Sequence, residues 1–157
     1  MRKNIVGTIA RGVPVAEAPW IDIERHAEVD VSSEEASHPV ESAFRHGDAE
    51  YWRAAEPGAQ TLRLRFDDPR HIRRIRLVFT ERASARTQEF LLSWSRDNGA
   101  TYRDVVRQQY TFSPPGTVRE AEDYRVQLED VTTLELHIVP DISGGMARAS
   151  LTEWAIE

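Results

Sequence analysis

Hydrophobic and polar residues alternate along much of the chain from residue 60 onward. In residues 60–66, the apolar side chains from Leu62 to Phe66 are separated by polar ones. Successive side chains of a β-strand point to opposite faces of its sheet, so these apolar residues are expected to share one buried face. The alternation resumes at residues 72–79, after a turn signal at residues 67–69. Two alternating runs joined by a short proline-containing connection predict a β-hairpin.

Similar short segments occur elsewhere in the chain, and turn residues separate them. We expect one or two strands within 20–31, further strands at 90–95, 106–110, 124–128, 134–138 and 151–156, and one brief helix at 39–44. This series of about eight short strands favours an antiparallel sandwich or barrel over alternating βαβ units. We find no internal repeat or linker, so we expect a single domain over residues 1–157, in which 1–27 form an extension or an added strand.

Composition narrows the expected environment. With 20 basic and 26 acidic residues the net charge is −6, which mildly repels nucleic acid and anionic membranes. The absence of cysteine excludes disulfides, a thiolate nucleophile and a cysteine-ligated zinc site. Thr8 and Arg11 interrupt the first apolar stretch, which is too short for a signal peptide, and no later stretch reaches the roughly 20 apolar residues of a membrane helix. We expect a soluble, cytoplasmic protein that does not bind membranes.

The sequence carries no recognisable catalytic motif. Its five histidines include no pair four residues apart, which a helix-borne metal site would need. Gly144-Gly145 lacks the lysine of a phosphate-binding loop. Ser32-Ser33 lies at the end of a predicted strand, where a hydroxyl commonly bonds to backbone rather than acting as a nucleophile. We therefore expect no enzyme activity, no cofactor and no catalytic residue.

A series of loose motifs occurs in a recognisable order over residues 28–157. The series is Ser32-Ser33, Pro39-Val40-Glu41-Ser42-Ala43-Phe44, Trp52, Leu62-Arg63-Leu64-Arg65-Phe66, Ile72-Arg73-Arg74-Ile75-Arg76-Leu77, Phe90-Leu91-Leu92-Ser93-Trp94-Ser95-Arg96-Asp97-Asn98-Gly99 and Leu151-Thr152-Glu153-Trp154-Ala155-Ile156. Their order resembles the discoidin family, also called the coagulation factor 5/8 type C domain family. The resemblance implies an all-β fold, a galactose-binding-domain-like jelly-roll sandwich of about eight antiparallel strands with extended loops at one end.

The resemblance also bears on metal binding, because the loop before the tryptophan often helps to hold a structural calcium ion in this family. Here that loop runs from Arg45 to Trp52, with Asp48 after the glycine and no threonine. Calcium needs several oxygen ligands, and Asp48, Glu50 and Glu153 could supply some of them. The departure from the family pattern leaves the calcium site open, and we assign no metal ligand from the sequence.

Four long connections carry the residue types of a sugar site. They span residues 34–51, 80–87, 111–122 and 140–148, and loops of this length within a compact domain are often functional. Sugar sites combine an aromatic face with arginine or other polar groups. Small residues separate Arg82 from Arg86 and leave both guanidinium groups room to reach a ligand. We predict a site formed by Arg82, Arg86, Trp52, Phe112 and Arg148. Both aromatic residues could instead have structural roles.

These features predict a non-catalytic binding module whose end loops bind a carbohydrate or another polar small ligand. A module that binds a protein partner or forms a homo-oligomer is the alternative. A third hypothesis is nucleic-acid binding by outward arginines that would cluster across the predicted hairpin; these are Arg63, Arg65, Arg74 and Arg76. Acidic residues such as Glu135 could pair with them across strands instead, which makes nucleic acid the least favoured partner.

Overall fold

The computed structural model describes residues 20–157, so residues 1–19 of the extension predicted at 1–27 lie outside the described part of the chain. Within these residues, the helical segments are α3 (Ile23–His26) and the 3-10 helix η1 (Val40–Phe44). The strands are β1 (Ala27–Val31), β2 (Trp52–Arg53), β3 (Gln60–Thr80), β4 (Arg86–Ser95), β5 (Arg103–Phe112), β6 (Arg119–Val139), β7 (Ser150–Leu151) and β8 (Glu153–Ile156). The helix expected at 39–44 is present as η1. Residues 20–22 form no strand, and α3 follows them.

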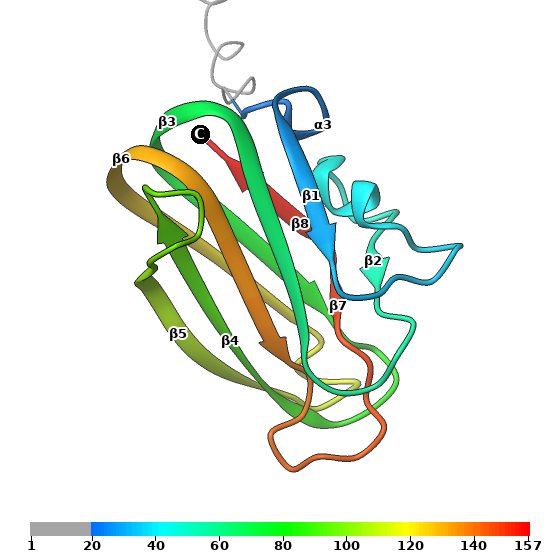
Figure 1. Cartoon of the computed structure of the whole chain (residues 1–157). Helices are drawn as coiled ribbons and strands as arrows, with labels where there is room; N and C mark the ends of the chain where they lie inside the picture. The colour runs from blue at the N-terminus through cyan, green and yellow to red at the C-terminus, as the bar shows by residue number, and fades with distance from the viewer. Residues whose placement is uncertain (1–19) are drawn as a thin grey trace, which may run out of the picture.

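Two long, bent strands organise the fold. β3 and β6 each contain 21 residues and pair antiparallel from Gln60 opposite Ile138 to Thr80 opposite Arg119. Both strands curve over one end of the molecule (Figure 1), and their register shifts at the curve, between Arg65 and Arg74. Each strand therefore contributes one half to each of two stacked layers.

The predicted hairpin at residues 60–79 is wrong. The two alternating runs are consecutive halves of β3, and the turn signal at 67–69 marks the bend between them. The chain does not reverse there because β6 bends opposite the same point, with Asp130 in a left-handed conformation at φ 57°. β6 thereby keeps a partner for both halves of β3. The strands expected at 124–128 and 134–138 are likewise two halves of β6.

Strand pairing defines the two layers. In one layer, the first half of β3 lies between β1 and the second half of β6, which continues to β4 and the edge strand β5. In the other layer, the second half of β3 lies between β8 and the first half of β6. The rings of Phe79 and Phe90, one from each layer, meet in the interior with centroids 5.1 Å apart. The predicted all-β antiparallel sandwich is confirmed, and the face from Leu62 to Phe66 is buried as expected.

A separate two-stranded sheet lies beside the sandwich (Figure 1), where β2 pairs with β7 through Trp52 opposite Leu151. Both of these side chains are fully buried, and the indole of Trp52 donates to the carbonyl of Ser33 at 3.0 Å. Trp52 and Leu151 therefore pack this small sheet against the core, while Arg53 and Ser150, the other residues of the two strands, are partly exposed. In residues 20–157, no helix combines the length and the apolar composition that crossing a membrane requires.

Candidate functional site

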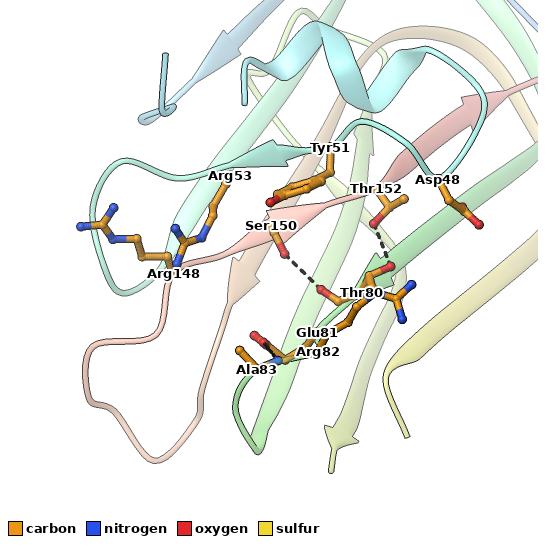
Figure 2. A pocket seen from close by; sticks show the side chains of 10 residues that line it. All are labelled: Asp48, Tyr51, Arg53, Thr80, Glu81, Arg82, Ala83, Arg148, Ser150 and Thr152. Carbon is orange, nitrogen blue, oxygen red and sulfur yellow. Dashed lines mark hydrogen bonds between the residues drawn. The ribbon is translucent and has the colours of Figure 1, made fainter. Parts of the chain in front are cut away.

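A pocket of about 300 Å³ lies between the β2–β7 sheet and the loop that joins β3 to β4. Five stretches of chain line it: the connection before β2, strand β2 itself, the end of β3, the β3–β4 loop, and the segment that runs through β7 toward β8. Figure 2 shows the ten side chains that line it. Segments far apart in the sequence thus converge on one concave surface.

Strand alternation decides which residues of β2 face the pocket. Trp52 points inward and is fully buried, so Tyr51 and Arg53 on either side of it point outward and line the pocket. One face of the Tyr51 ring is stacked on His38, with centroids 4.1 Å apart and planes 17° from parallel. The stack holds an aromatic ring at the pocket wall.

Hydroxyl groups line the pocket beside this ring. The Thr152 hydroxyl donates to the Thr80 hydroxyl at 3.0 Å, and Ser150 donates to the Thr80 carbonyl at 3.5 Å (Figure 2). Thr152 is nearly fully buried, whereas the other two residues are partly exposed. The pocket therefore offers neutral hydrogen-bonding groups between its charged walls.

Two arginines on one side of the pocket share a single carboxylate. Arg53 and Arg148 each donate from Nη1 to Oε2 of Glu35, both at 2.9 Å. Glu35 is mostly shielded from solvent, while both arginine side chains keep more than a third of their surface exposed. One carboxylate neutralises only one guanidinium, so this wall retains positive charge.

The β3–β4 loop, which carries Arg82, is organised by Glu81. One oxygen of the Glu81 carboxylate accepts from the backbone amides of Ala83 and Ser84 at 2.9 and 3.2 Å. Its other oxygen accepts from Nε of Arg86 at 2.7 Å. Burial raises the pKa of Glu81, but the hydrogen bond from Arg86 and those from the two amides outweigh it, so the pKa lies below its ordinary value.

Arg86 anchors this loop from the interior. Its side chain is only 1% exposed, and its Nη1 donates to the carbonyl of Pro140 at 2.8 Å. Its guanidinium also lies 4.8 Å from the centroid of the Phe112 ring, which is fully buried. Arg86 thus joins the β3–β4 loop to the end of β6 and presents no surface to the pocket.

The five residues predicted for the site separate into two groups. Arg82 and Arg148 line the pocket, whereas Arg86, Trp52 and Phe112 are buried behind it and present no open face to a ligand. The prediction missed Tyr51, Arg53 and Thr152. The sequence did contain a signal for the first two, because an inward Trp52 requires outward neighbours on a strand.

The three acidic residues weighed for calcium contact different basic partners, and Glu50 lies 3.5 Å from Nη1 of Arg45. Glu153 accepts from Nε of Arg76 at 3.0 Å, and its other oxygen lies 3.0 Å from Nδ1 of His46. Asp48 instead lies 3.9 Å from a guanidinium nitrogen of Arg119. Within the described residues, no group of three or more histidine, aspartate or glutamate side chains is arranged to hold a metal ion.

The predicted arginine row is divided between the two layers by the bend in β3. Each of its four members is paired with a carboxylate: Arg63 with Glu135 at 3.0 Å, Arg65 with Asp30 at 3.0 Å, Arg74 with Asp123 at 2.7 Å, and Arg76 with Glu153 at 3.0 Å. The expected cluster across a hairpin is therefore wrong, and cross-strand pairing takes its place.

Comparisons with known proteins support the fold through structure alone, since no protein-family model and no curated protein matches the sequence. The family 32 carbohydrate-binding module of AlyQ, solved with 4,5-unsaturated mannuronic acid, matches with a TM-score of 0.63 at 17% identity, over 89% of this chain and 98% of that one. The family 32 module of NanJ from C. perfringens, solved with galactose, matches with a TM-score of 0.58 at 14% identity, over 86% and 96%. A pectin-binding carbohydrate-binding module matches with a TM-score of 0.60 at 17% identity, over 84% and 90%.

Each match covers most of this chain and most of the matched module. The similarity therefore extends over the whole architecture. The chain has the galactose-binding-domain-like jelly-roll sandwich of the family 32 carbohydrate-binding modules, which confirms the fold implied by the resemblance to discoidin domains. Sequence identities of 14–17% are too low to carry residue roles from those modules to this chain.

Proposed function

We propose that this chain is a non-catalytic carbohydrate-binding module whose ligand occupies the pocket beside the β2–β7 sheet. The observation that carries the proposal is the convergence of the Tyr51 ring, three arginines and three hydroxyl-bearing residues on one open concavity. An aromatic ring packs against the apolar face of a sugar ring, and polar groups around it recognise the sugar hydroxyls. The matched modules solved with sugars support the same class of ligand.

The state of Glu81, a partly shielded carboxylate of the pocket lining, supports binding without catalysis. Glu81 lies in a salt bridge with Arg86, and both of its oxygens accept hydrogen bonds, so it is ionised at neutral pH and has no proton to donate. A general acid for glycoside cleavage needs a raised pKa instead. The pocket therefore lacks a buried acid suited to glycoside chemistry among the residues that line it.

A protein partner is the second candidate, and the loop between β6 and β7 is the observation that favours it. Ile142 and Met146 in this loop are 50% and 80% exposed. The loop also carries Arg148, so a partner that covered the two apolar side chains would lie next to the pocket. The predicted cytoplasmic location bears on either candidate and remains a proposal.

A glycan array followed by titration calorimetry tests the carbohydrate proposal. We expect a saccharide to bind the purified chain, and we expect Tyr51→Ala to weaken it by about tenfold, the order of a lost ring contact. Arg107→Ala is the control, because Arg107 lies on β5, outside the pocket, and pairs with Glu89. Absence of saccharide binding at millimolar concentration, or equal effects of the two substitutions, would overturn the proposal.

A further inference from the structure

We infer that the pocket selects acidic saccharides, in which a sugar ring bears a carboxylate, over their neutral counterparts. This inference rests on the proposed carbohydrate-binding function and goes further by naming the chemical class of the ligand. It is carried by an excess of positive charge in the pocket of a chain whose net charge is −6.

The excess follows from the ion pairs around the pocket. Of the two carboxylates in the pocket lining, Glu81 pairs with the buried Arg86, and Asp48 lies 3.9 Å from a guanidinium nitrogen of Arg119, which is not part of the lining. Glu35 is shared by two guanidinium groups of the lining, and it can balance only one of them. One positive charge of that shared set therefore remains without a compensating carboxylate.

Arg82 supplies a second uncompensated charge. Its residue is exposed, and within residues 20–157 it forms no salt bridge. Its backbone is held in place, because the carboxylate of the preceding Glu81 binds the next two backbone amides and is itself anchored by Arg86. A guanidinium on a prearranged loop loses less conformational freedom on binding than one on a mobile loop.

The arrangement of these charges suits a ring held at Tyr51. In Figure 2, Arg53 and Arg148 lie on one side of the Tyr51 ring, and Arg82 lies on the other. If a sugar ring stacks on Tyr51, its carboxylate can point to either side of the tyrosine and meet a guanidinium of the same pocket. Guanidinium and carboxylate groups match in shape, and their two-pronged charge-assisted hydrogen bonds are stronger than neutral ones.

A neutral sugar would leave these charges without an anionic partner. Its hydroxyls can accept hydrogen bonds from the same guanidinium groups, but in each such bond the acceptor is uncharged. A hydrogen bond between guanidinium and carboxylate is stronger than one between guanidinium and hydroxyl. The difference corresponds to an affinity for the acidic sugar about tenfold to a hundredfold higher than for its neutral counterpart. The attraction is partly screened by salt because the arginines are solvent-exposed.

Calorimetry on matched pairs of trisaccharides tests the inference. The pairs are trisaccharides of galacturonate and galactose, of mannuronate and mannose, and of glucuronate and glucose. The two members of each pair have the same glycosidic linkages. We expect at least one acid to bind about tenfold or more tightly than its neutral counterpart, and we expect that margin to shrink between about 50 and 500 mM salt.

Two substitutions assign the preference to the pocket. Arg82→Gln keeps hydrogen-bonding capacity and removes the charge, so it should abolish most of the preference, and Arg148→Gln should reduce it. Arg107→Gln removes an equivalent charge on β5, outside the pocket, and should leave the preference intact. Circular dichroism verifies that each variant is folded.

The possible results separate the two proposals. Neutral sugars that bind as tightly as the acids, with Arg82→Gln unchanged, would overturn the acidic preference and leave carbohydrate binding in place. A preference that persists in both pocket variants would also overturn it. Failure of every saccharide to bind would overturn carbohydrate binding itself.

Discussion

Arg82 on the β3–β4 loop and Arg86, four residues later at the start of β4, have opposite environments. Arg82 faces the pocket, while Arg86 is 1% exposed and spans Glu81, the Pro140 carbonyl and the Phe112 ring. A buried charge is tolerated when it is paired and hydrogen-bonded, and Arg86 is bonded through Nε and Nη1, while its Nη2 is buried without a partner among the described residues. Their roles are therefore different: Arg82 can contact a ligand, and Arg86 positions the loop that carries it.

Alanine substitution should separate these two arginines by stability. Arg86→Ala removes the partner of Glu81 and leaves a shielded carboxylate unpaired, which is expected to lower the free energy of unfolding by about 3–5 kcal/mol. Arg82→Ala removes an exposed side chain and should change it by less than about 0.5 kcal/mol. Urea denaturation of both variants measures the difference. Similar values for the two would contradict the structural role of Arg86.

At the scale of elements, a polar cluster joins the edge strand β5 to the opposite layer. Glu120 on β6 is 2% exposed and accepts hydrogen bonds from Gln88 on β4 and Gln108 on β5. Gln108 also donates to Glu122 and accepts from Tyr124, both on β6. Burial, together with the neighbouring charge of Glu122, raises the pKa of Glu120 to about 8. The β4–β5 edge of the sandwich is thus closed by hydrogen bonds as well as by apolar packing.

This cluster predicts a particular dependence of stability on pH. Between the ordinary pKa of 4.5 and the folded value of about 8, the folded state holds a proton on Glu120 that the unfolded chain has lost. The free energy of unfolding should therefore fall as pH rises through this window, by at most about 1.4 kcal/mol per pH unit. Glu120→Gln cannot lose a proton and should flatten that fall, as measured by urea denaturation at pH 5–9.

Glu129→Gln is the matched control for this experiment, because Glu129 is an exposed residue of the same strand. It should leave the pH dependence close to that of the original chain. If the Glu120→Gln profile also remained parallel to the original, Glu120 would not hold a proton in the folded state at neutral pH.

At the scale of the whole molecule, the distribution of charge matters more than its total. Arg63, Arg65, Arg74 and Arg76 of β3 are paired with carboxylates from β1, β6 and β8. The pocket also holds positive charge without a paired carboxylate, from Arg82 and from the two arginines that share Glu35. The charges of the pocket lie within a space of about 300 Å³, which suits a small anionic ligand.

We accordingly expect no appreciable binding of nucleic acid. A net charge of −6 opposes approach of a polyanion, and the paired arginines would have to exchange their carboxylates for phosphates. Fluorescence anisotropy with a labelled single-stranded 30-mer at about 100 mM salt should show no saturation up to about 10 μM protein, the weak range of nonspecific binding. Submicromolar binding with a steep salt dependence would contradict this expectation.

Local alternation was sufficient to predict which residues are buried over much of the sandwich. Leu62 and Phe66 on one half of β3, and Ile75 and Phe79 on the other, are buried as their spacing indicates. The period of two depends only on the geometry of an extended chain, and so it can be recognised without knowledge of the partner strand. The all-β class and the order of motifs that implied the jelly roll were therefore accessible from the sequence alone.

Only the tertiary structure decided how these segments are connected and which side chains reach the pocket. Residues 67–69 form a bend rather than a reversal because β6 bends beside them and pairs with both halves of β3. Arg86 is buried because Glu81 and the end of β6 close around it, and Tyr51 faces the pocket because Trp52 is drawn into the core. These outcomes depend on contacts between residues distant in the chain, which a local pattern of hydrophobic and polar positions does not contain.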